Sequence, residues 1–111
     1  MKKILCLLVL LVLMMGCQLD KNPFLGTWKA DLSSFPDISP EDYWIITFYE
    51  DGTFTGSEQI GSVLYVESGY YEYTETVLML KFKGEPDPEV VLYVIYDDVM
   101  VWEGWIYFYR Q

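Results

Sequence analysis

Short runs of β-branched and aromatic residues fill the chain from Leu25 to Arg110, and this pattern constrains the fold more than any other feature. Turn-forming residues separate the runs, and no run shows an apolar period of 3.6 residues over three helical turns. Such punctuation is typical of β-strands joined by turns. The sequence predicts strands over Leu25–Ala30, Tyr43–Tyr49, Thr53–Glu58, Val63–Glu67, Gly69–Thr74, Val77–Phe82, Val90–Tyr96, Val99–Glu103 and Trp105–Arg110.

Two acidic turns set the pairing of their neighbouring strands. Asp51-Gly52 is a strong hairpin signal, and we expect a three-residue loop with Gly52 in the left-handed conformation. That register places Phe48 opposite Phe54 and gathers apolar side chains on one face, namely Trp44, Ile46, Phe48 and Phe54. Asp97-Asp98 is expected to form a second tight turn, between two strands that are apolar on both faces.

The order of these hairpins predicts the fold class. No long crossover connection is left over, so we expect an all-β domain over residues 23–111, an up-and-down antiparallel barrel of about eight short strands. The longer loops are Asp31–Asp42 and Lys83–Glu89. Within the first, Ser39-Pro40-Glu41-Asp42 has the cap, the proline and the acidic residues of a single helical turn.

The N-terminus has the features of a targeting segment. Two lysines precede an apolar run, Ile4–Met15, whose 12 residues are too few to span a membrane and fit a signal peptide over residues 1–16. Met14-Met15-Gly16-Cys17 resembles the bacterial lipobox, which implies that Cys17 becomes the lipidated first residue of a linker over residues 17–22. We expect a membrane lipoprotein of the bacterial cell envelope, and Gln18 after the cysteine favours the outer membrane where there are two.

Composition excludes several functional classes. Removal of Lys2 and Lys3 with the signal peptide leaves five basic and seventeen acidic residues, a net charge of −12, which disfavours nucleic acid as a partner. The chain has no histidine, its serines lack an activating base, and no glycine-rich phosphate loop appears, so we expect neither an enzyme nor a cofactor. Glu85–Glu89 carries carboxylates at alternate positions, but their spacing differs from that of an EF-hand, which favours a solvated loop over a calcium site.

Several ordered motifs, taken together, carry a family resemblance. They are Gly26-Thr27-Trp28 near the first strand, the hairpin Ile46–Phe54, Gly69-Tyr70-Tyr71, the alternation Leu78-x-Leu80-x-Phe82 and the terminal Tyr107-Phe108-Tyr109-Arg110. In this order the chain resembles the small bacterial lipocalin-like lipoproteins, whose barrel is of the calycin type. The resemblance implies that Arg110 stacks on Trp28, next to Gly26, and closes the base of the barrel.

The ten tyrosines and four tryptophans allow three interpretations. The aromatic side chains fill the barrel; or they line a pocket beneath a lid that carries Phe35 and Ile38; or they form an external binding patch around Trp102 and Trp105. The pocket of the second interpretation consists of Trp44, Ile46, Phe48, Phe54, Tyr71, Tyr73, Leu78 and Leu80.

Two functions from different classes follow from this pattern. The first is non-catalytic binding of a small hydrophobic ligand, which acidic loops bias towards neutral or cationic molecules. The alternative is an envelope protein-interaction module, such as an inhibitor or an adhesin, that recognises a cationic protein partner. Membrane attachment through acyl chains on Cys17 is common to both.

Overall fold

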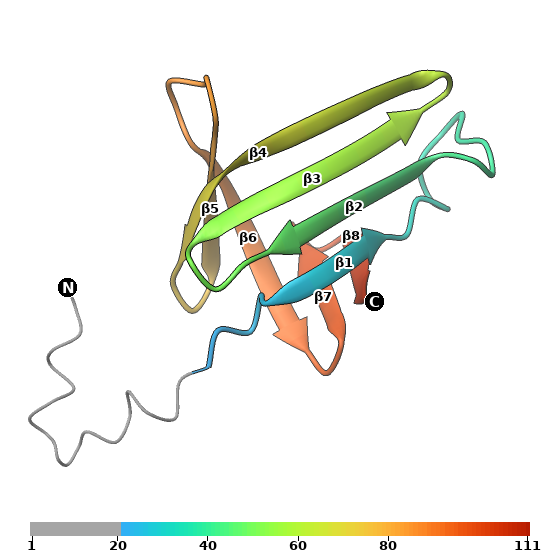
Figure 1. The fold of residues 1–111 in the computed structure, drawn as a ribbon. Helices are drawn as coiled ribbons and strands as arrows, with labels where there is room; N and C mark the ends of the chain where they lie inside the picture. The colour runs from blue at the N-terminus through green and yellow to red at the C-terminus, as the bar shows by residue number, and fades with distance from the viewer. Residues whose placement is uncertain (1–20) are drawn as a thin grey trace, which may run out of the picture.

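The computed structural model describes residues 21–111, so the predicted signal peptide and the predicted lipidation of Cys17 lie outside the described residues. The described chain forms a closed antiparallel barrel in which each strand pairs with the next and β8 pairs with β1 (Figure 1). The predicted all-β barrel is thereby confirmed. The strands are β1 Gly26–Ala30, β2 Tyr43–Phe48, β3 Thr53–Ile60, β4 Val63–Tyr73, β5 Val77–Phe82, β6 Glu89–Tyr96, β7 Val99–Trp102 and β8 Ile106–Arg110.

The register predicted for the first hairpin and the tight turn predicted at Asp97-Asp98 are both confirmed. Phe48 pairs with Phe54 across the first hairpin, and Gly52 has a φ of 90°. At the second turn Tyr96 pairs with Val99, and Asp97 adopts a φ of 53°. These registers orient alternate side chains of each strand towards the interior, where they form one core.

One strand prediction is wrong: residues 63–73 form the single strand β4, not two strands separated at Ser68. Gly69 is in the strand because β4 and β5 approach closely there. A Cβ atom at this position would lie 2.0 Å from the carbonyl oxygen of Lys81. The missing side chain is therefore a requirement of backbone packing.

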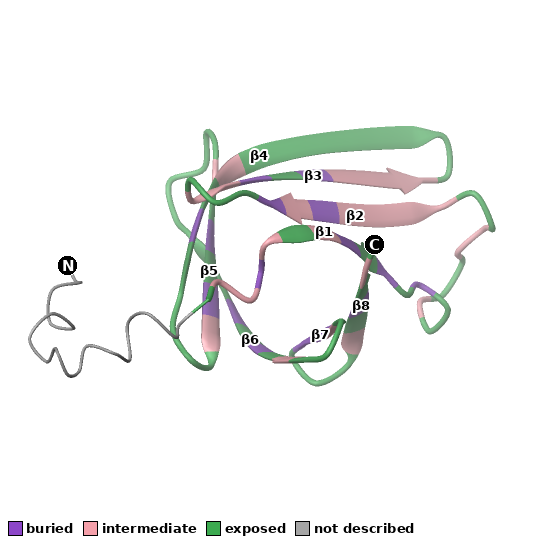
Figure 2. Ribbon diagram, turned by 60° about the horizontal axis from the view of Figure 1, so that its bottom comes forward, coloured by how far each residue is buried: buried purple, intermediate pink, exposed green. Residues whose placement is uncertain are grey.

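Part of the sheet extends beyond the closed barrel. Tyr43 and Trp44 of β2 have no partner in β1, and β4 pairs only with β3 until it reaches Gly69. The far ends of β2, β3 and β4 therefore form a three-stranded ribbon (Figure 1), whose β4 edge is exposed (Figure 2).

The long loop between β1 and β2 contains a hydrogen-bonded turn where a helical turn was predicted. The Asp42 backbone N–H donates to the Ser39 carbonyl at 3.0 Å, and the Asp42 carboxylate accepts from the Ser39 N–H and hydroxyl. Residues 21–111 contain no helix, and so none that is long and apolar enough to cross a membrane.

Gly69→Ala is predicted to lower the free energy of unfolding by about 3 kcal/mol, because the new Cβ atom must push β4 and β5 apart. Gly56→Ala is the matched control, since Gly56 is also in a strand and its added Cβ would lie 3.7 Å from the nearest atom. We expect a change below about 1 kcal/mol for the control. Urea unfolding of both variants measures the difference, and equal losses would refute the close approach.

Candidate functional site

One end of the barrel is filled by a side chain from outside the strands. Phe24, which precedes β1, is fully buried, and its ring lies 4.7–6.1 Å from four other aromatic rings, those of Phe48, Tyr71, Tyr73 and Tyr93. The turns at residues 49–52, 74–76 and 97–98 lie at this end of the strands, which we call the closed end. No ligand space is left where Phe24 packs.

Arg110 contacts several groups at the closed end. Its guanidinium carbon lies 4.2 Å from the centre of the Trp28 ring. The guanidinium also donates to the carbonyls of Pro23 and Leu25, on either side of Phe24, and to the Asp98 carboxylate. A Cβ atom at Gly26 would lie 3.3 Å from the Arg110 side chain, so glycine leaves space for this packing.

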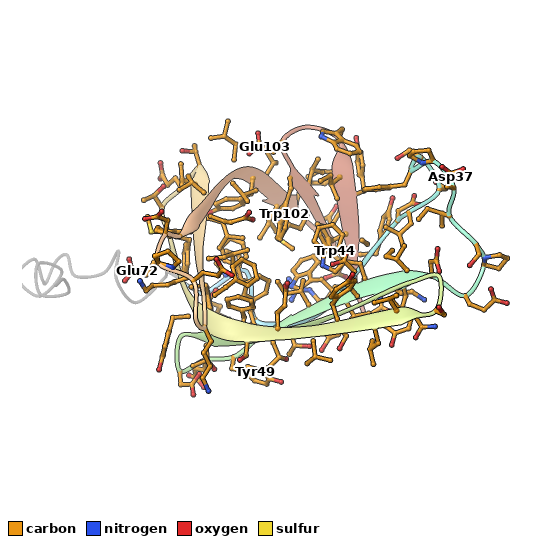
Figure 3. The ribbon with its side chains drawn as sticks, turned by 90° about the horizontal axis from the view of Figure 1, so that it is seen from above. Asp37, Trp44, Tyr49, Glu72, Trp102 and Glu103 are labelled. Atoms are coloured by element: carbon orange, nitrogen blue, oxygen red, sulfur yellow. The ribbon has the colours of Figure 1, made fainter. Side chains whose placement is uncertain are left out.

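The opposite, open end contains a chamber of about 200 Å³. Residues of β2, β3 and β4 form one wall, and residues of β5 to β8 with the β7–β8 turn form the other. Figure 3 shows Trp44 and Trp102 projecting into the space between these walls. The apolar lining residues are Trp44, Ile46, Phe54, Leu80, Phe82, Val91, Trp102 and Ile106.

The structure divides the predicted pocket residues between the two ends. Four of them line the chamber together: Trp44, Ile46, Phe54 and Leu80. Phe48, Tyr71 and Leu78 are buried outside its lining, while Tyr73 is 40% exposed and borders an outer groove. The residues predicted as a lid, Phe35 and Ile38, pack against the core without lining the chamber, and the Phe35 ring lies 5.2 Å from that of Trp105.

Trp102 lies inside the barrel, so the predicted external patch around Trp102 and Trp105 is wrong for Trp102. Its side chain is 5% exposed, whereas Trp105 is 52% exposed. The reason is register: the turn at Asp97-Asp98 pairs Trp102 with Tyr93, which also faces inward. That turn was the one sequence signal able to place Trp102 in the lining.

The indole nitrogen of Trp102 is a buried donor with no hydrogen-bond partner. Trp44 and Phe108 pack against the ring at centroid distances of 5.7 and 4.5 Å, which fixes its orientation. It is the one such buried side-chain atom between residues 21 and 111. Buried donors are nearly always paired, so this N–H marks a place where an acceptor is missing.

Carboxylates surround the mouth of the chamber. Glu67, Glu89 and Glu103 border it, and the Glu103 carboxylate accepts from the Leu92 backbone N–H at 3.0 Å. Glu67 and Glu89 also border an adjoining open groove of about 780 Å³, whose other acidic residues are Glu58, Glu85 and Asp87. Among the described residues no group of three acidic, histidine or cysteine side chains could hold a metal ion.

Glu67 is the carboxylate most affected by this environment. Partial removal from water raises its pKa above the ordinary value, and the negative charges of Glu58, Glu89 and Glu85 raise it further. The mouth thus favours a cation or a hydrogen-bond donor over an anion.

Comparison of the chain with protein-family models, with curated proteins and with solved structures found no match.

The raised pKa of Glu67 predicts a pH-dependent stability. A carboxyl group that binds its proton more tightly in the folded state stabilises the fold when the pH is below the ordinary pKa of 4.5. This contribution is lost as the pH rises through the higher pKa of the folded state. We therefore expect the unfolding free energy of Glu67→Gln, relative to that of the wild type, to increase as the pH is raised from acidic to neutral. Urea unfolding at a series of pH values measures it.

Glu72→Gln is the control, because Glu72 lies on the outer face of β4 and pairs with Met79. An advantage of Glu67→Gln that stays constant with pH, or that grows equally in the control, would contradict the assignment.

Proposed function

We propose that this protein is a lipid-anchored, lipocalin-like binding protein of the bacterial cell envelope, and that its open-end chamber holds a small hydrophobic ligand without catalysis. The N-terminal sequence with Gly16-Cys17 supports the anchor and the address. The meander of eight antiparallel strands and the Arg110–Trp28 stack support the lipocalin-like architecture.

The unpaired indole N–H of Trp102 is the observation that carries the binding proposal. The Trp102 side chain lines the apolar chamber and is held by aromatic neighbours, and its nitrogen is buried, where an unmet hydrogen bond costs about 1–3 kcal/mol. A ligand that places an acceptor at this nitrogen removes the cost while its apolar part is buried.

The chamber also restricts the ligand in size and charge. Ligand pockets usually measure about 300–1,000 Å³, so 200 Å³ admits a single ring or the end of a longer molecule. A longer molecule continues into the adjoining groove, because Trp44, Glu67, Phe82 and Glu89 border both spaces. The carboxylates at the mouth select neutral or cationic ligands over anionic ones.

The adjoining groove favours a second candidate function, recognition of a cationic protein. It is open, and Glu58, Glu85 and Asp87 line it together with the two carboxylates that it shares with the chamber. A lysine- or arginine-bearing segment fits this charge, and its association rate would fall steeply with salt. A partner of this kind does not need the indole N–H of Trp102.

Three probes of similar size test the ligand class: benzyl alcohol, benzylamine and benzoate. We expect calorimetry to show binding of the alcohol and the amine, and no binding of the anion. Trp102→Phe is expected to weaken benzyl alcohol binding about fivefold, because one hydrogen bond is lost while the ring remains. Trp105→Phe, outside the chamber, is the control and should bind like the wild type.

Native mass spectrometry of the protein purified from its lipid environment provides the second measurement. A small-molecule adduct that is lost on denaturation, and is weaker in Trp102→Phe, supports the binding function. The second candidate is supported instead if the protein carries no adduct, binds none of the three probes and binds a cationic protein.

A further inference from the structure

The outer surface of the barrel is not uniform. Outward positions of β3 are polar throughout: Thr53, Thr55, Ser57 and Gln59. On the opposite strands the outward positions are apolar, because β6 and β7 carry apolar residues on both faces. We use "apolar outer face" for Val90, Leu92, Val94 and Tyr96 of β6 with Tyr107 and Tyr109 of β8.

This face is exposed and uncharged. Val90, Leu92 and Val94 are 57%, 56% and 59% exposed. Val101 of β7 lies between β6 and β8 and lines a shallow outer groove of about 320 Å³ together with Leu92 and Val94. Glu103 is the one charged residue that lines this groove, and its carboxylate accepts from the Leu92 backbone N–H. Exposed apolar areas of this kind on small proteins mark contacts with a membrane or a partner.

Apart from Glu103, the charged residues lie at the borders of the face. Lys29 of β1 pairs with Tyr109 at one border, and Lys81 of β5 lies beyond Met79 towards the other. The tyrosines at the borders combine an apolar ring with a polar hydroxyl, which suits the boundary between acyl chains and headgroups. The acidic groove lies at the open end, where Glu89 borders it and directly precedes Val90 in β6, so the face is farthest from this groove at its Tyr96 end.

The first described residues, Lys21 and Pro23, lie near one end of the apolar outer face. Lys21 and Pro23 border an outer groove together with Val94 and Ile95 at the end of β6. Cys17 precedes Lys21 by four residues, which span at most about 14 Å when fully extended. Acyl chains on Cys17 therefore enter the bilayer close to the Val94 end of the apolar outer face.

We propose that the apolar outer face lies on the surface of the bilayer into which Cys17 is anchored. This inference rests on the proposed lipid anchor, and it is independent of any ligand in the chamber. The anchor keeps the face close to the bilayer, and the face then buries its aliphatic side chains at the headgroup–acyl boundary. The polar outer face of β3 points away from the membrane.

The test uses the full-length protein, processed by its host and reconstituted in phosphatidylcholine vesicles. Val94→Cys introduces a thiol on the face, and Thr55→Cys introduces one at an exposed position of β3 as the matched control. An environment-sensitive fluorophore on each thiol is exposed to lipids spin-labelled on their acyl chains, and separately to iodide in the water. We expect acyl-chain quenching about threefold stronger at residue 94, with the opposite order for iodide.

Equal quenching at the two positions would overturn the proposal. Protection of residue 94 from both quenchers would also overturn it, because a second copy or another protein then covers the face. The protein without introduced cysteines tests the anchor separately: lipidated Cys17 takes up no fluorophore and shows the added acyl mass. A labelled, unacylated Cys17 would refute the anchor, and the docking with it.

Discussion

Arg110 connects the last strand to the segment that precedes the first, and the closed end of the barrel depends on this connection. Its guanidinium covers Trp28, and its N–H groups reach the carbonyls of Pro23 and Leu25 on both sides of Phe24. A planar group with several fixed donors can stack and donate at once, which a lysine ammonium cannot do. Trp28 adds a second tie, because its indole nitrogen donates to the Phe24 carbonyl at 2.8 Å.

The position of Phe24 decides how the interior is divided. An eight-stranded barrel is just wide enough for its own side chains or one small ligand, so filling one end determines where free space remains. At the other end Gly56 faces inward between Ile46 and Glu67 and contributes no side chain. The chamber is the result of a large residue at one end and a missing side chain at the other.

Alternation and turn chemistry made much of this fold predictable. Leu78 and Leu80 are buried as their shared face implies, and the turn at Gly52 sets the Phe48–Phe54 pair. Phe24 was missed because it precedes the first strand, so no periodic pattern assigns it a face. The continuity of β4 through Ser68 was missed, and the role of Gly69 depends on the Lys81 backbone, which is distant in sequence.

The same limit applies to β6 and β7. Both faces of these strands are apolar, so alternation of hydropathy does not show which side chains face inward. There the pairing across Asp97-Asp98, and not hydropathy, turns Tyr93 and Trp102 inward and Leu92 and Val94 outward. Strands that are apolar on both sides need two apolar environments, and the core supplies only one. In the docking proposed above, the bilayer supplies the second.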